Sequence, residues 1–396
     1  MTTPASKLVF ISPFNLFDPA NGAVQSIRTM LEQLTHHGYE CHALTACCFE
    51  GAASGSPAEV LSDQGLTASG QIAAYKLPVW QGSKKSVSYN AVQIPTTTRD
   101  QMTAVEELIF RDTIKAWLEQ HRPDIVITFG GYLLDIEIQR CARAVGAKVV
   151  FYLANSRYGR PDTFLNVDLV ITNSASAVTH YENTLKLTCH NVGVFVDSQA
   201  CIAQQRDPRF VSFINPIPEK GVTLFLKLVE KATRELPAMR FMVVESRGQL
   251  ATALQQSHMS AAMLNQITVL PLQQNMSAVY AKTRVLLMPS FWLESAGRIL
   301  IEANANGIPV IASDFGGIPE TLAISEHLFP VPEKCKMNFW NVPTDEEIEV
   351  WWQALKKLWD DDTYYRRSSE QALAVAKSQT LHNKVTHLAD LLRSII

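Results

Sequence analysis

Two glutamates, Glu294 and Glu302, flank Gly297 at the start of a predicted helix, and their types and spacing suit ligand binding. A glycine at a helix N-terminus exposes backbone N–H groups to an anion, a contact worth up to about 2 kcal/mol. Carboxylates beside an anion would repel it unless they hold something else, such as hydroxyl groups. A nucleotide sugar, with a diphosphate and hydroxyl-rich flanks, meets both demands. The alternative is a buried strand–helix unit whose glutamates merely cap and solvate the helix.

Two buried strands and a short helix are expected to position these carboxylates. Residues 284–288 form an apolar run of the kind that a parallel sheet buries on both faces. Ser295 or Glu294 is expected to cap a helix over residues 297–306, and a second buried strand is expected at 309–313. The glutamates therefore belong to the loop and helix that follow a strand end.

Three more polar segments also follow predicted strands. Lys220 stands beside Glu219 at a helix start, where a lysine opposes the helix dipole unless an anionic partner outweighs the penalty. Arg247 could hold a phosphate through two parallel hydrogen bonds. Gly316-Gly317 permits close approach of a ligand to the backbone. Each segment also has a plain alternative, such as a solvated lysine paired with Glu219 or an arginine that faces solvent.

Length and composition bound the class of protein. The 396 residues suffice for two domains with proper cores, and a hydrophobic content of 47% excludes disorder. Lys and Arg number 35 against 38 Asp and Glu, and this net charge of −3 argues against nucleic acid as a partner. No apolar run approaches the ~20 residues of a transmembrane helix. We expect no transmembrane segment, while a peripheral membrane contact stays open.

The ends and the cysteines favour a cytoplasmic protein. The N-terminus leads directly into a strand without the charged-then-apolar pattern of a secretory signal. The seven cysteines are scattered and lack metal-type spacing, which fits a reducing compartment.

Motifs of other chemistries are missing from the sequence. The first strand is not followed by Gly-x-Gly-x-x-Gly, and there is neither a phosphate-loop lysine motif nor a Gly-x-Ser-x-Gly nucleophile motif. The ten histidines include no His-x-x-x-His pair. We therefore expect no cofactor and no metal site.

Strand and helix signals alternate through both halves of the chain. In the first half, strands are expected at residues 8–12, 39–45, 72–77, 124–129, 147–153 and 168–173, and residues 191–196 close this half. In the second half they are expected at 209–214, 239–244, 266–270, 284–288, 309–313 and 327–330. Residues 49–71 are interpreted as a mobile loop or insertion. A helix over 102–121 is expected to carry Val105, Leu108, Ile109 and Trp117 on its inner side.

This alternation predicts an α/β protein with two Rossmann-like, doubly wound parallel-sheet domains that face each other across a cleft. The expected domains are residues 1–196 and 197–378. The last helix, over 379–396, is expected to pack back on the first domain.

The combined pattern resembles the retaining glycosyltransferases of family 4, which have the GT-B fold. Residues 294–303 match that family's paired-glutamate motif, with seven residues between the glutamates. Residues 308–317 and 218–221 match its neighbouring blocks, whereas the first half matches only through the Gly22 loop and Gly38-Tyr-Glu.

The resemblance implies that residues 1–196 lie on the acceptor side and that residues 197–378 bind the donor. It also implies roles for individual residues. Glu294 would hold hydroxyls of the donor sugar, and Lys220 would bind the diphosphate and neutralise the leaving group; these two are the predicted catalytic residues. Glu302 would hold the ribose hydroxyls. The predicted donor-binding residues are Glu302, Gly22, Asn215, Arg247, Gly297, Arg298, Ile299 and Gly316. The enzymes of this family need no metal and no enzyme nucleophile.

The chain departs from the family pattern at two places. Asn215 stands where many members carry an arginine, and Arg247 is our hypothesis for the replacement charge. Ala154 stands where the family often has a histidine, so either Asn155 or Arg157 takes over that acceptor-side role or the acceptor chemistry differs from the family's.

The resulting hypothesis is a cytoplasmic retaining glycosyltransferase that uses a nucleotide-diphosphate sugar, with a UDP-sugar favoured. The acceptor is unidentified and could be a glycan, a lipid-linked molecule, a small molecule or a peptide. It would enter near residues 13–22, 80–100 and 154–161. The alternatives are a nucleotide-sugar epimerase of the same fold and a catalytically silent nucleotide-sugar binder.

Overall fold

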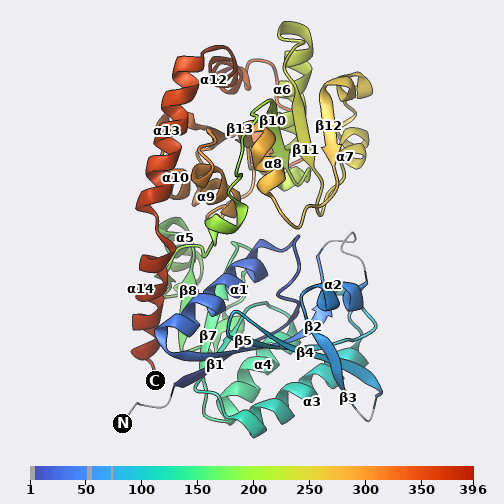
Figure 1. Ribbon diagram of the computed structural model, residues 1–396, viewed down its shortest axis with the longest axis vertical. Helices are drawn as coiled ribbons and strands as arrows, with labels where there is room; N and C mark the ends of the chain where they lie inside the picture. Colours follow the sequence, from blue (N-terminus) through green and yellow to red (C-terminus); the bar gives the residue numbers. More distant parts are fainter. Residues whose placement is uncertain (1–4, 51–55, 73–74) are drawn as a thin grey trace. The chain divides into compact units, whose positions relative to one another are not determined.

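The computed structural model describes residues 5–50, 56–72 and 75–396, which form two compact units. Unit 1 contains the described residues up to Phe195 together with Leu381–Ile396, and unit 2 is Val196–Thr380. Figure 1 colours the chain along its sequence, so that the return of its last helix to unit 1 can be followed.

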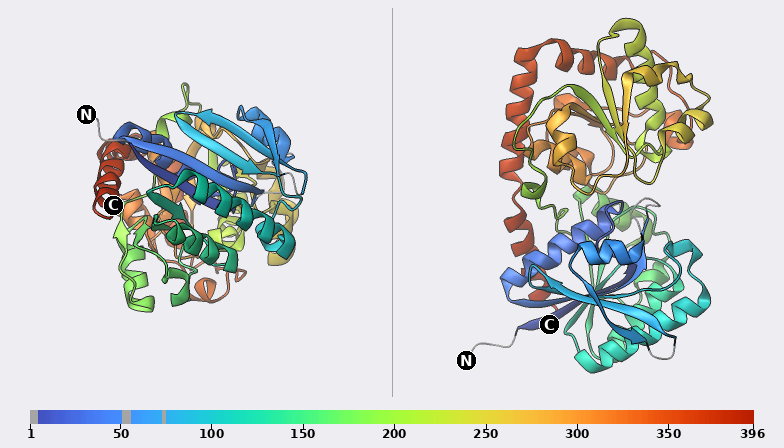
Figure 2. Two further views of the ribbon diagram at one scale, coloured as in Figure 1. Left: turned by 90° about the horizontal axis from the view of Figure 1, so that it is seen from below. Right: turned by 45° about the vertical axis from the view of Figure 1, so that its right-hand side comes forward.

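Unit 1 is built on one nine-stranded sheet in the order β3-β4-β5-β2-β1-β6-β7-β8-β9. The strands from β5 to β9 in this order pair in parallel, whereas β3 and β4 form an antiparallel hairpin at one edge (Figure 2). The strands are β1 (Ser6–Phe14), β2 (Tyr39–Cys48), β3 (Thr67–Ile72), β4 (Leu77–Lys84), β5 (Val87–Val92), β6 (Ile125–Thr128), β7 (Lys148–Leu153), β8 (Leu169–Thr172) and β9 (His190–Asn191).

Helices cover both faces of this sheet because its central strands carry apolar side chains on both sides. In β1, Leu8 and Phe10 pack with α1 (Gly22–Leu34), α5 (Ala175–Leu185) and α14 (Leu381–Arg393). The alternating residues Val9 and Ile11 pack with α3 (Ala104–His121) and α4 (Leu133–Ala144) on the other face. The short helix α2 (Pro57–Asp63) precedes the hairpin.

Unit 2 contains a six-stranded, wholly parallel sheet in the order β12-β11-β10-β13-β14-β15. The strands are β10 (Phe210–Ile214), β11 (Phe241–Val244), β12 (Ile267–Leu270), β13 (Thr283–Met288), β14 (Val310–Ser313) and β15 (Leu328–Phe329). Counted from β10, the order is 3-2-1-4-5-6, the doubly wound arrangement of dinucleotide-binding folds. The strand order reverses between β10 and β13, which makes that junction the topological switch point.

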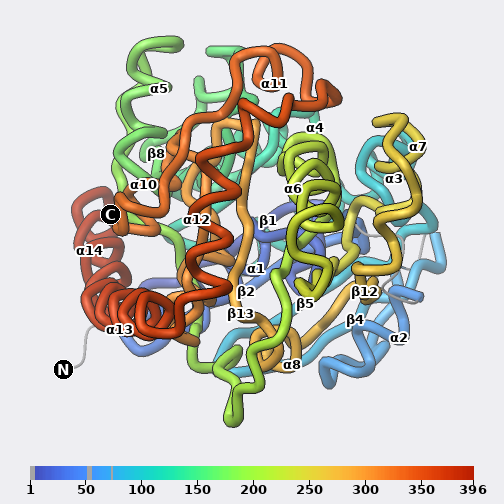
Figure 3. Tube along the Cα trace, turned by 90° about the horizontal axis from the view of Figure 1, so that it is seen from above, coloured from blue at the N-terminus to red at the C-terminus, as the bar shows by residue number. Residues whose placement is uncertain are grey.

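Two helical layers also enclose the unit 2 sheet. On one face lie α6 (Val222–Glu235), α7 (Leu250–Ser257) and α12 (Glu349–Asp360) (Figure 3). On the other lie α8 (Ser277–Lys282), α9 (Arg298–Ala305), α10 (Ile318–Leu322) and α13 (Asp362–Ser378). The short helix α11 (Glu333–Met337) follows β15. Each unit therefore has its own three-layer core.

Short 3-10 helices and free thiols complete the description. The 3-10 helices are Thr35–His37, Arg99–Gln101, Pro161–Phe164, Ser198–Cys201, Pro218–Lys220, Ala261–Gln266 and Ser325–His327. All seven cysteines are free. Within the described ranges, none of the helices combines the length and apolar character that a membrane crossing needs.

The sequence predicted unit 2 better than the first half of unit 1. All six strands expected in unit 2 are present within one or two residues of their expected ends. In unit 1, the strand expected at 72–77 is wrong: β3 ends at Ile72, β4 begins at Leu77, and residues 73–74 lie outside the described part. The segment 49–71, expected to be a loop, contains α2 and most of β3, while residues 51–55 also lie outside the description.

The inner face expected for the helix that starts near residue 102 is also partly wrong. Ile109 is buried, but Val105 and Leu108 are 60% and 48% exposed. The helix has a wide apolar surface, and only the side with Phe110, Ile114 and Leu118 reaches the core.

Candidate functional site

The candidate site lies where β10 and β13 end, because ligands of open parallel sheets bind at the carboxyl ends of strands beside the switch point. The loop after β10 contains Lys220, and the loop after β13 contains Glu294. The two loops are joined by their backbones, since the N–H groups of Phe291 and Trp292 donate to the carbonyl oxygen of Glu219 at 2.9 and 3.2 Å. This connection sets the separation of the two charged side chains.

Lys220 and Glu294 form an ion pair across these loops. The Lys220 Nζ donates to Glu294 Oε1 at 2.5 Å, and the Ser290 hydroxyl lies 2.7 Å from the same oxygen. Glu294 is 9% exposed, whereas the lysine side chain is 25% exposed. A buried carboxylate that stays paired can retain its charge. The pair presents an ammonium group for phosphate oxygens next to a carboxylate for hydroxyl groups.

Two glycines allow the loops to approach each other this closely. Gly221 has φ +78°, and a Cβ there would lie 1.9 Å from the carbonyl oxygen of Pro289. Gly316 has φ +66°, and its Cβ would lie 2.5 Å from the carbonyl oxygen of Glu294. The N–H of Gly317 also donates to that oxygen at 2.7 Å. The loops after β10, β13 and β14 thus meet around Glu294, and only glycine fits at either contact.

Glu302 is held on the second turn of α9. Its Oε2 accepts from the Tyr280 hydroxyl at 2.7 Å, and its Oε1 accepts from Arg298 at 3.1 Å. Burial and the neighbouring carboxylate raise the pKa of Tyr280 well above its usual value, so the phenol remains a donor. Each carboxylate oxygen has a second lone pair available for a hydroxyl group.

The cap of α9 differs from the one expected. The N-cap is Gly297, at φ +89°, and not Ser295 or Glu294. Glycine has no side chain to cap the first turn, so the helix begins with backbone donors and a positive dipole end. No side chain from Gly297 caps this helix start, and the predicted use of the backbone near Arg298 and Ile299 by a ligand stays a prediction.

Asn215 connects two loops at the strand ends. Its Oδ1 accepts from the backbone N–H groups of Arg247 and Gly248 at 3.1 and 3.2 Å. Its φ of +62° lies in the left-handed region, where asparagine is tolerated far better than arginine. Arg247 is exposed on the loop after β11, which Asn215 therefore positions. The structure shows a loop-connecting role for Asn215, while its predicted contact with a donor stays a prediction.

The predicted residues divide between the two units. Unit 2 joins Lys220 to Glu294, with Gly316 at the Glu294 loop, and it places Glu302 on α9, the helix that begins after Gly297. Unit 1 contains the three remaining predicted residues, Gly22, Asn155 and Arg157. Their predicted share in phosphate or acceptor binding remains a prediction.

The unit 1 residues lie at strand ends of their own sheet. Gly22 begins α1, whose N-cap Asn21 accepts from the N–H groups of Ala23 and Val24 at 3.0 and 3.2 Å. Asn155 follows β7, and its Oδ1 accepts from the N–H of Arg157 at 2.9 Å. The backbone carbonyl of Asn155 accepts from Tyr181 at 2.6 Å.

Sequence reasoning missed two residues that support the charged groups. The Ser290 hydroxyl donates to the Glu294 carboxylate. Ser290 is the second residue after the buried strand β13, and this position at a strand end could have identified it as a candidate site residue. Tyr280 lies on α8, 22 residues before Glu302, and no periodicity or motif links these two positions. A contact of this kind depends on the packing of α8 against α9.

The sequence of unit 2 matches a known family. Residues 201–339 match the family model described as "Glycosyl transferases group 1". That segment contains Lys220, Glu294, Glu302 and the loops around them. This part of the chain is therefore similar to a glycosyltransferase group 1 domain.

One curated relative is similar over a shorter stretch. It is the D-inositol 3-phosphate glycosyltransferase of Mycobacteroides abscessus, with 32% identity over 124 residues. The aligned region is 30% of this chain and 27% of the relative, so the match spans about a quarter of the relative's length.

Solved structures match the fold over nearly the whole chain. Anabaena Alr3699/HepE, in complex with UDP and glucose, has a TM-score of 0.68 at 14% identity, covering 98% of this chain and 100% of that one. The catalytic domain of starch synthase IV from Arabidopsis thaliana, bound to ADP and acarbose, has a TM-score of 0.67 at 12% identity, covering 99% of both. The two Rossmann-like units of this chain therefore constitute the GT-B fold.

Proposed function

We propose that the protein is a retaining glycosyltransferase that moves a sugar from a nucleotide-diphosphate sugar to an acceptor hydroxyl. The observation that carries the proposal is the Lys220–Glu294 pair at the switch point of unit 2, inside the segment that matches the glycosyltransferase family. The D-inositol 3-phosphate glycosyltransferase and the sugar- and nucleotide-bound structural relatives support the same class of reaction.

The site offers a separate group for each part of such a donor. Lys220 would bind the diphosphate oxygens, together with backbone N–H groups at the start of α9. Glu294 would accept hydrogen bonds from sugar hydroxyls, and Glu302 from the ribose hydroxyls. Because Tyr280 and Arg298 hold Glu302 in place, its carboxylate is oriented before a ribose arrives.

The chemistry follows from these positions and from the family resemblance. The bond between the anomeric carbon and the diphosphate oxygen breaks, and its electron pair leaves with the diphosphate. The acceptor oxygen bonds to the anomeric carbon from the same face, and its proton passes to the departing diphosphate. The Lys220 ammonium and the α9 backbone donors stabilise the charge that develops on the leaving group. With these donors in place, we propose that turnover needs no divalent metal, which activity in excess EDTA would test.

The nucleotide base and the acceptor require experiments. UDP is the first candidate because Alr3699/HepE was solved with UDP, but starch synthase IV was solved with ADP. A thermal-shift panel of UDP, GDP and ADP at equal concentrations identifies the base by the largest stabilisation. The acceptor screen begins with D-inositol 3-phosphate, the substrate named for the curated relative, and continues with glycans, lipid-linked sugars and peptides.

The decisive test uses Lys220→Ala against a matched lysine variant. We expect Lys220→Ala to lower kcat/KM for the donor about 100-fold or more, as for loss of one charge-stabilising donor. Lys227→Ala is the control, since Lys227 lies on α6 and pairs with Glu230 and Asp345 in the same unit. Equal rates for the two variants would refute the role of Lys220.

Product analysis separates transfer from the other readings of the site. Sugar transfer or release from a labelled donor supports the proposal, whereas conversion of the nucleotide sugar to its epimer identifies an epimerase. Stabilisation by nucleotide sugars without any turnover identifies a silent binder.

A second variant tests the exposed arginine next to Asn215. Arg247→Ala should weaken binding of the nucleoside diphosphate about tenfold if its guanidinium reaches the phosphates. Unchanged affinity would leave Lys220 and the α9 backbone as the phosphate-binding groups.

A further inference from the structure

Three exposed leucines lie together on one face of unit 1. They are Leu108, Leu133 and Leu165, which are among the twelve large hydrophobic residues exposed within the described ranges. Leu133 and Leu165 are 77% and 78% exposed. Monomeric proteins rarely expose contiguous apolar side chains of this size without a partner. We call this surface the α3–α4 face.

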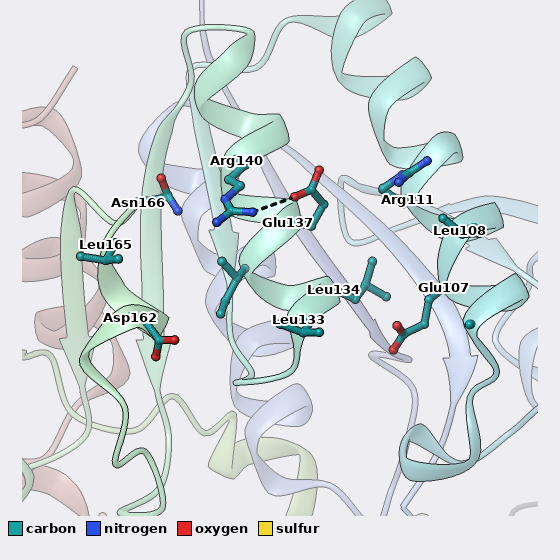
Figure 4. Close-up of a pocket in the computed structure, with 12 residues that line it drawn as sticks. Glu107, Leu108, Arg111, Leu133, Leu134, Glu137, Arg140, Asp162, Leu165 and Asn166 are labelled. Carbon is teal, nitrogen blue, oxygen red and sulfur yellow. Dashed lines mark hydrogen bonds and ion pairs between the residues drawn. The ribbon is translucent and has the colours of Figure 1, made fainter.

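The same residues line a groove of about 580 Å³ (Figure 4). Leu108 comes from α3, Leu133 and Leu134 come from α4, and Leu165 comes from the segment before β8. Figure 4 shows the three segments around the groove, with the leucines between charged side chains. The groove therefore combines an apolar floor with a charged rim.

The core of unit 1 does not account for these leucines. In α3, the side with Phe110, Ile114 and Leu118 is completely buried against the sheet, and Leu108 lies outside that cluster. In α4, Leu134 and Ile138 reach the same core, whereas Leu133 does not. Each helix thus has a second apolar position directed away from the core.

The charges on the rim follow the same order on both helices. On α3, Glu107 precedes Arg111 by four residues, and on α4, Glu137 precedes Arg140 by three. Arg140 Nη1 lies 3.5 Å from Glu137 Oε2, and the two side chains are 65% and 37% exposed, respectively. In an antiparallel pairing of one helix with its own copy, the acidic end of one helix meets the basic end of the other.

We propose that the α3–α4 face is a self-association surface, on which two copies of this chain pair about a twofold axis. A twofold contact requires a surface that is complementary to itself. Leucines surrounded by acid-then-base pairs on both helices meet that requirement. The leucines of the two copies would form the centre of the contact, and Glu137 of one copy would face Arg140 of the other.

The rim favours a second copy over a lipid surface. A face that binds anionic membranes needs an excess of Lys and Arg. The groove instead presents three acidic side chains, Glu107, Glu137 and Asp162, and two basic ones, Arg111 and Arg140. Glu107 is paired with Arg99, and Asp162 with Arg160, so the face has no excess of positive charge that would attract anionic headgroups.

The test measures the mass of the full chain by light scattering after gel filtration over a range of loading concentrations. We expect a mass that rises with concentration toward twice the 44.0 kDa of one chain. Leu133→Glu and Leu165→Glu should each raise the dissociation constant about 100-fold, because every dimer contains the change twice. Both leucines are exposed, so these variants should fold as the parent does. Met337→Glu, at an 87% exposed leucine-sized side chain in unit 2, is the matched control and should leave the dimer intact.

A charge exchange gives a sharper test of the pairing. Glu137→Arg alone and Arg140→Glu alone place like charges opposite each other, so each should weaken the dimer about tenfold. The double variant Glu137→Arg/Arg140→Glu restores opposite charges across the axis and should recover most of the affinity. Failure of the double variant to recover overturns the proposed pairing.

Two other outcomes overturn the proposal. One is a single-chain mass at every concentration up to about 100 μM, a range that captures even weak dimers. The other is a dimer that Leu133→Glu and Leu165→Glu leave unchanged. Flotation with vesicles of a phosphatidylcholine and phosphatidylserine mixture, lost in Leu133→Glu while the parent chain stays single, would assign the face to a lipid surface instead.

Discussion

The two sheets share one winding pattern, but their switch points carry different side chains. At the switch point of unit 2, the loops after β10 and β13 present the charged pair Lys220–Glu294. At the switch point of unit 1, between β1 and β6, Phe129 stacks on Phe14 and Phe10 with ring centroids 5.6 and 5.9 Å apart. The topology therefore sets where a ligand would bind, while the side chains set which ligand chemistry is served.

The loops of the two units are also held in different ways. In unit 2, backbone atoms touch backbone atoms at Gly221 and Gly316. In unit 1, side chains hold the loop after β6 in place. The Tyr158 hydroxyl accepts from the N–H of Gly130 at 3.2 Å, and the Asp135 carboxylate accepts from the N–H of Tyr132 at 2.9 Å. Backbone contacts fix the positions of the charged loops closely, as the proposed binding of a diphosphate would require. Contacts made by side chains can change with sequence while the fold is retained.

The largest effect is expected from a variant that breaks the backbone contact of unit 2. Gly221→Ala places a Cβ against the Pro289 carbonyl oxygen at a residue with a left-handed backbone conformation. It should lower the free energy of unfolding by about 3 kcal/mol or more. Gly146→Ala in unit 1 is the control, since φ is +88° there but nothing lies within 4 Å, and it should cost about 1 kcal/mol. Denaturant unfolding, with hydrogen exchange to assign each unit, measures both. Equal losses would contradict the comparison.

The second prediction concerns the buried acid of unit 1. Burial raises the pKa of Asp135 to about 7, and the nearby Arg99 opposes this shift only in part. The unfolded pKa is about 3.9, so the folded state binds the proton more tightly. The resulting stability is complete below about pH 4, is lost as the pH rises to about 7, and stays lost above that.

Asp135→Asn removes this titration and keeps an oxygen that accepts the Tyr132 N–H. We expect the variant to gain stability relative to the parent between about pH 4 and 7, reaching a few kcal/mol at pH 8. Unfolding free energies across that range provide the measurement. Asp63→Asn, at an exposed carboxylate of the same unit, is the control, and its free energy of unfolding should depend on pH as that of the parent does. A constant difference between Asp135→Asn and the parent would show that Asp135 is not the titrating group.

The third prediction compares one tyrosine hydroxyl in each unit. Tyr280 donates to the Glu302 carboxylate at 2.7 Å, and Tyr152 donates to the Ser26 hydroxyl at 2.9 Å. A hydrogen bond to a charged acceptor is the stronger, so Tyr280→Phe should cost about 2 kcal/mol and Tyr152→Phe about 1 kcal/mol. Only Tyr280→Phe should weaken nucleotide binding, which calorimetry measures. A loss of nucleotide affinity in Tyr152→Phe would contradict the prediction that only the tyrosine of unit 2 supports nucleotide binding.

The smallest expected effect is on the acceptor side. Asn155→Ala removes the short-range hydrogen bond to the Arg157 N–H and should change stability by less than about 1 kcal/mol. Donor affinity should stay unchanged, while the KM for an acceptor found in the screen should rise several-fold. A lower affinity for the donor together with an unchanged KM for the acceptor would contradict the acceptor-side role of Asn155.

Sequence patterns were most informative where burial on both faces leaves a continuous apolar signal. The strands of unit 2, such as Phe241–Val244 and Thr283–Met288, are short apolar runs that end in polar loops. The hairpin β3–β4 lies at a sheet edge and is partly exposed, so its residues alternate weakly and were misread. The apolar pattern that identifies a strand arises from burial, so it is weak in strands that are exposed at a sheet edge.

The sequence by itself determined the α/β class, the strands of unit 2 and the spacing of Glu294 and Glu302 along the chain. These features depend on local periodicity and on fixed positions in the sequence. Only the tertiary structure decided that Lys220 reaches Glu294, that Tyr280 holds Glu302, and that Leu108 faces outward. Those facts depend on which loops and helices are neighbours in space. Neighbours far apart in the chain leave no periodic trace in the sequence.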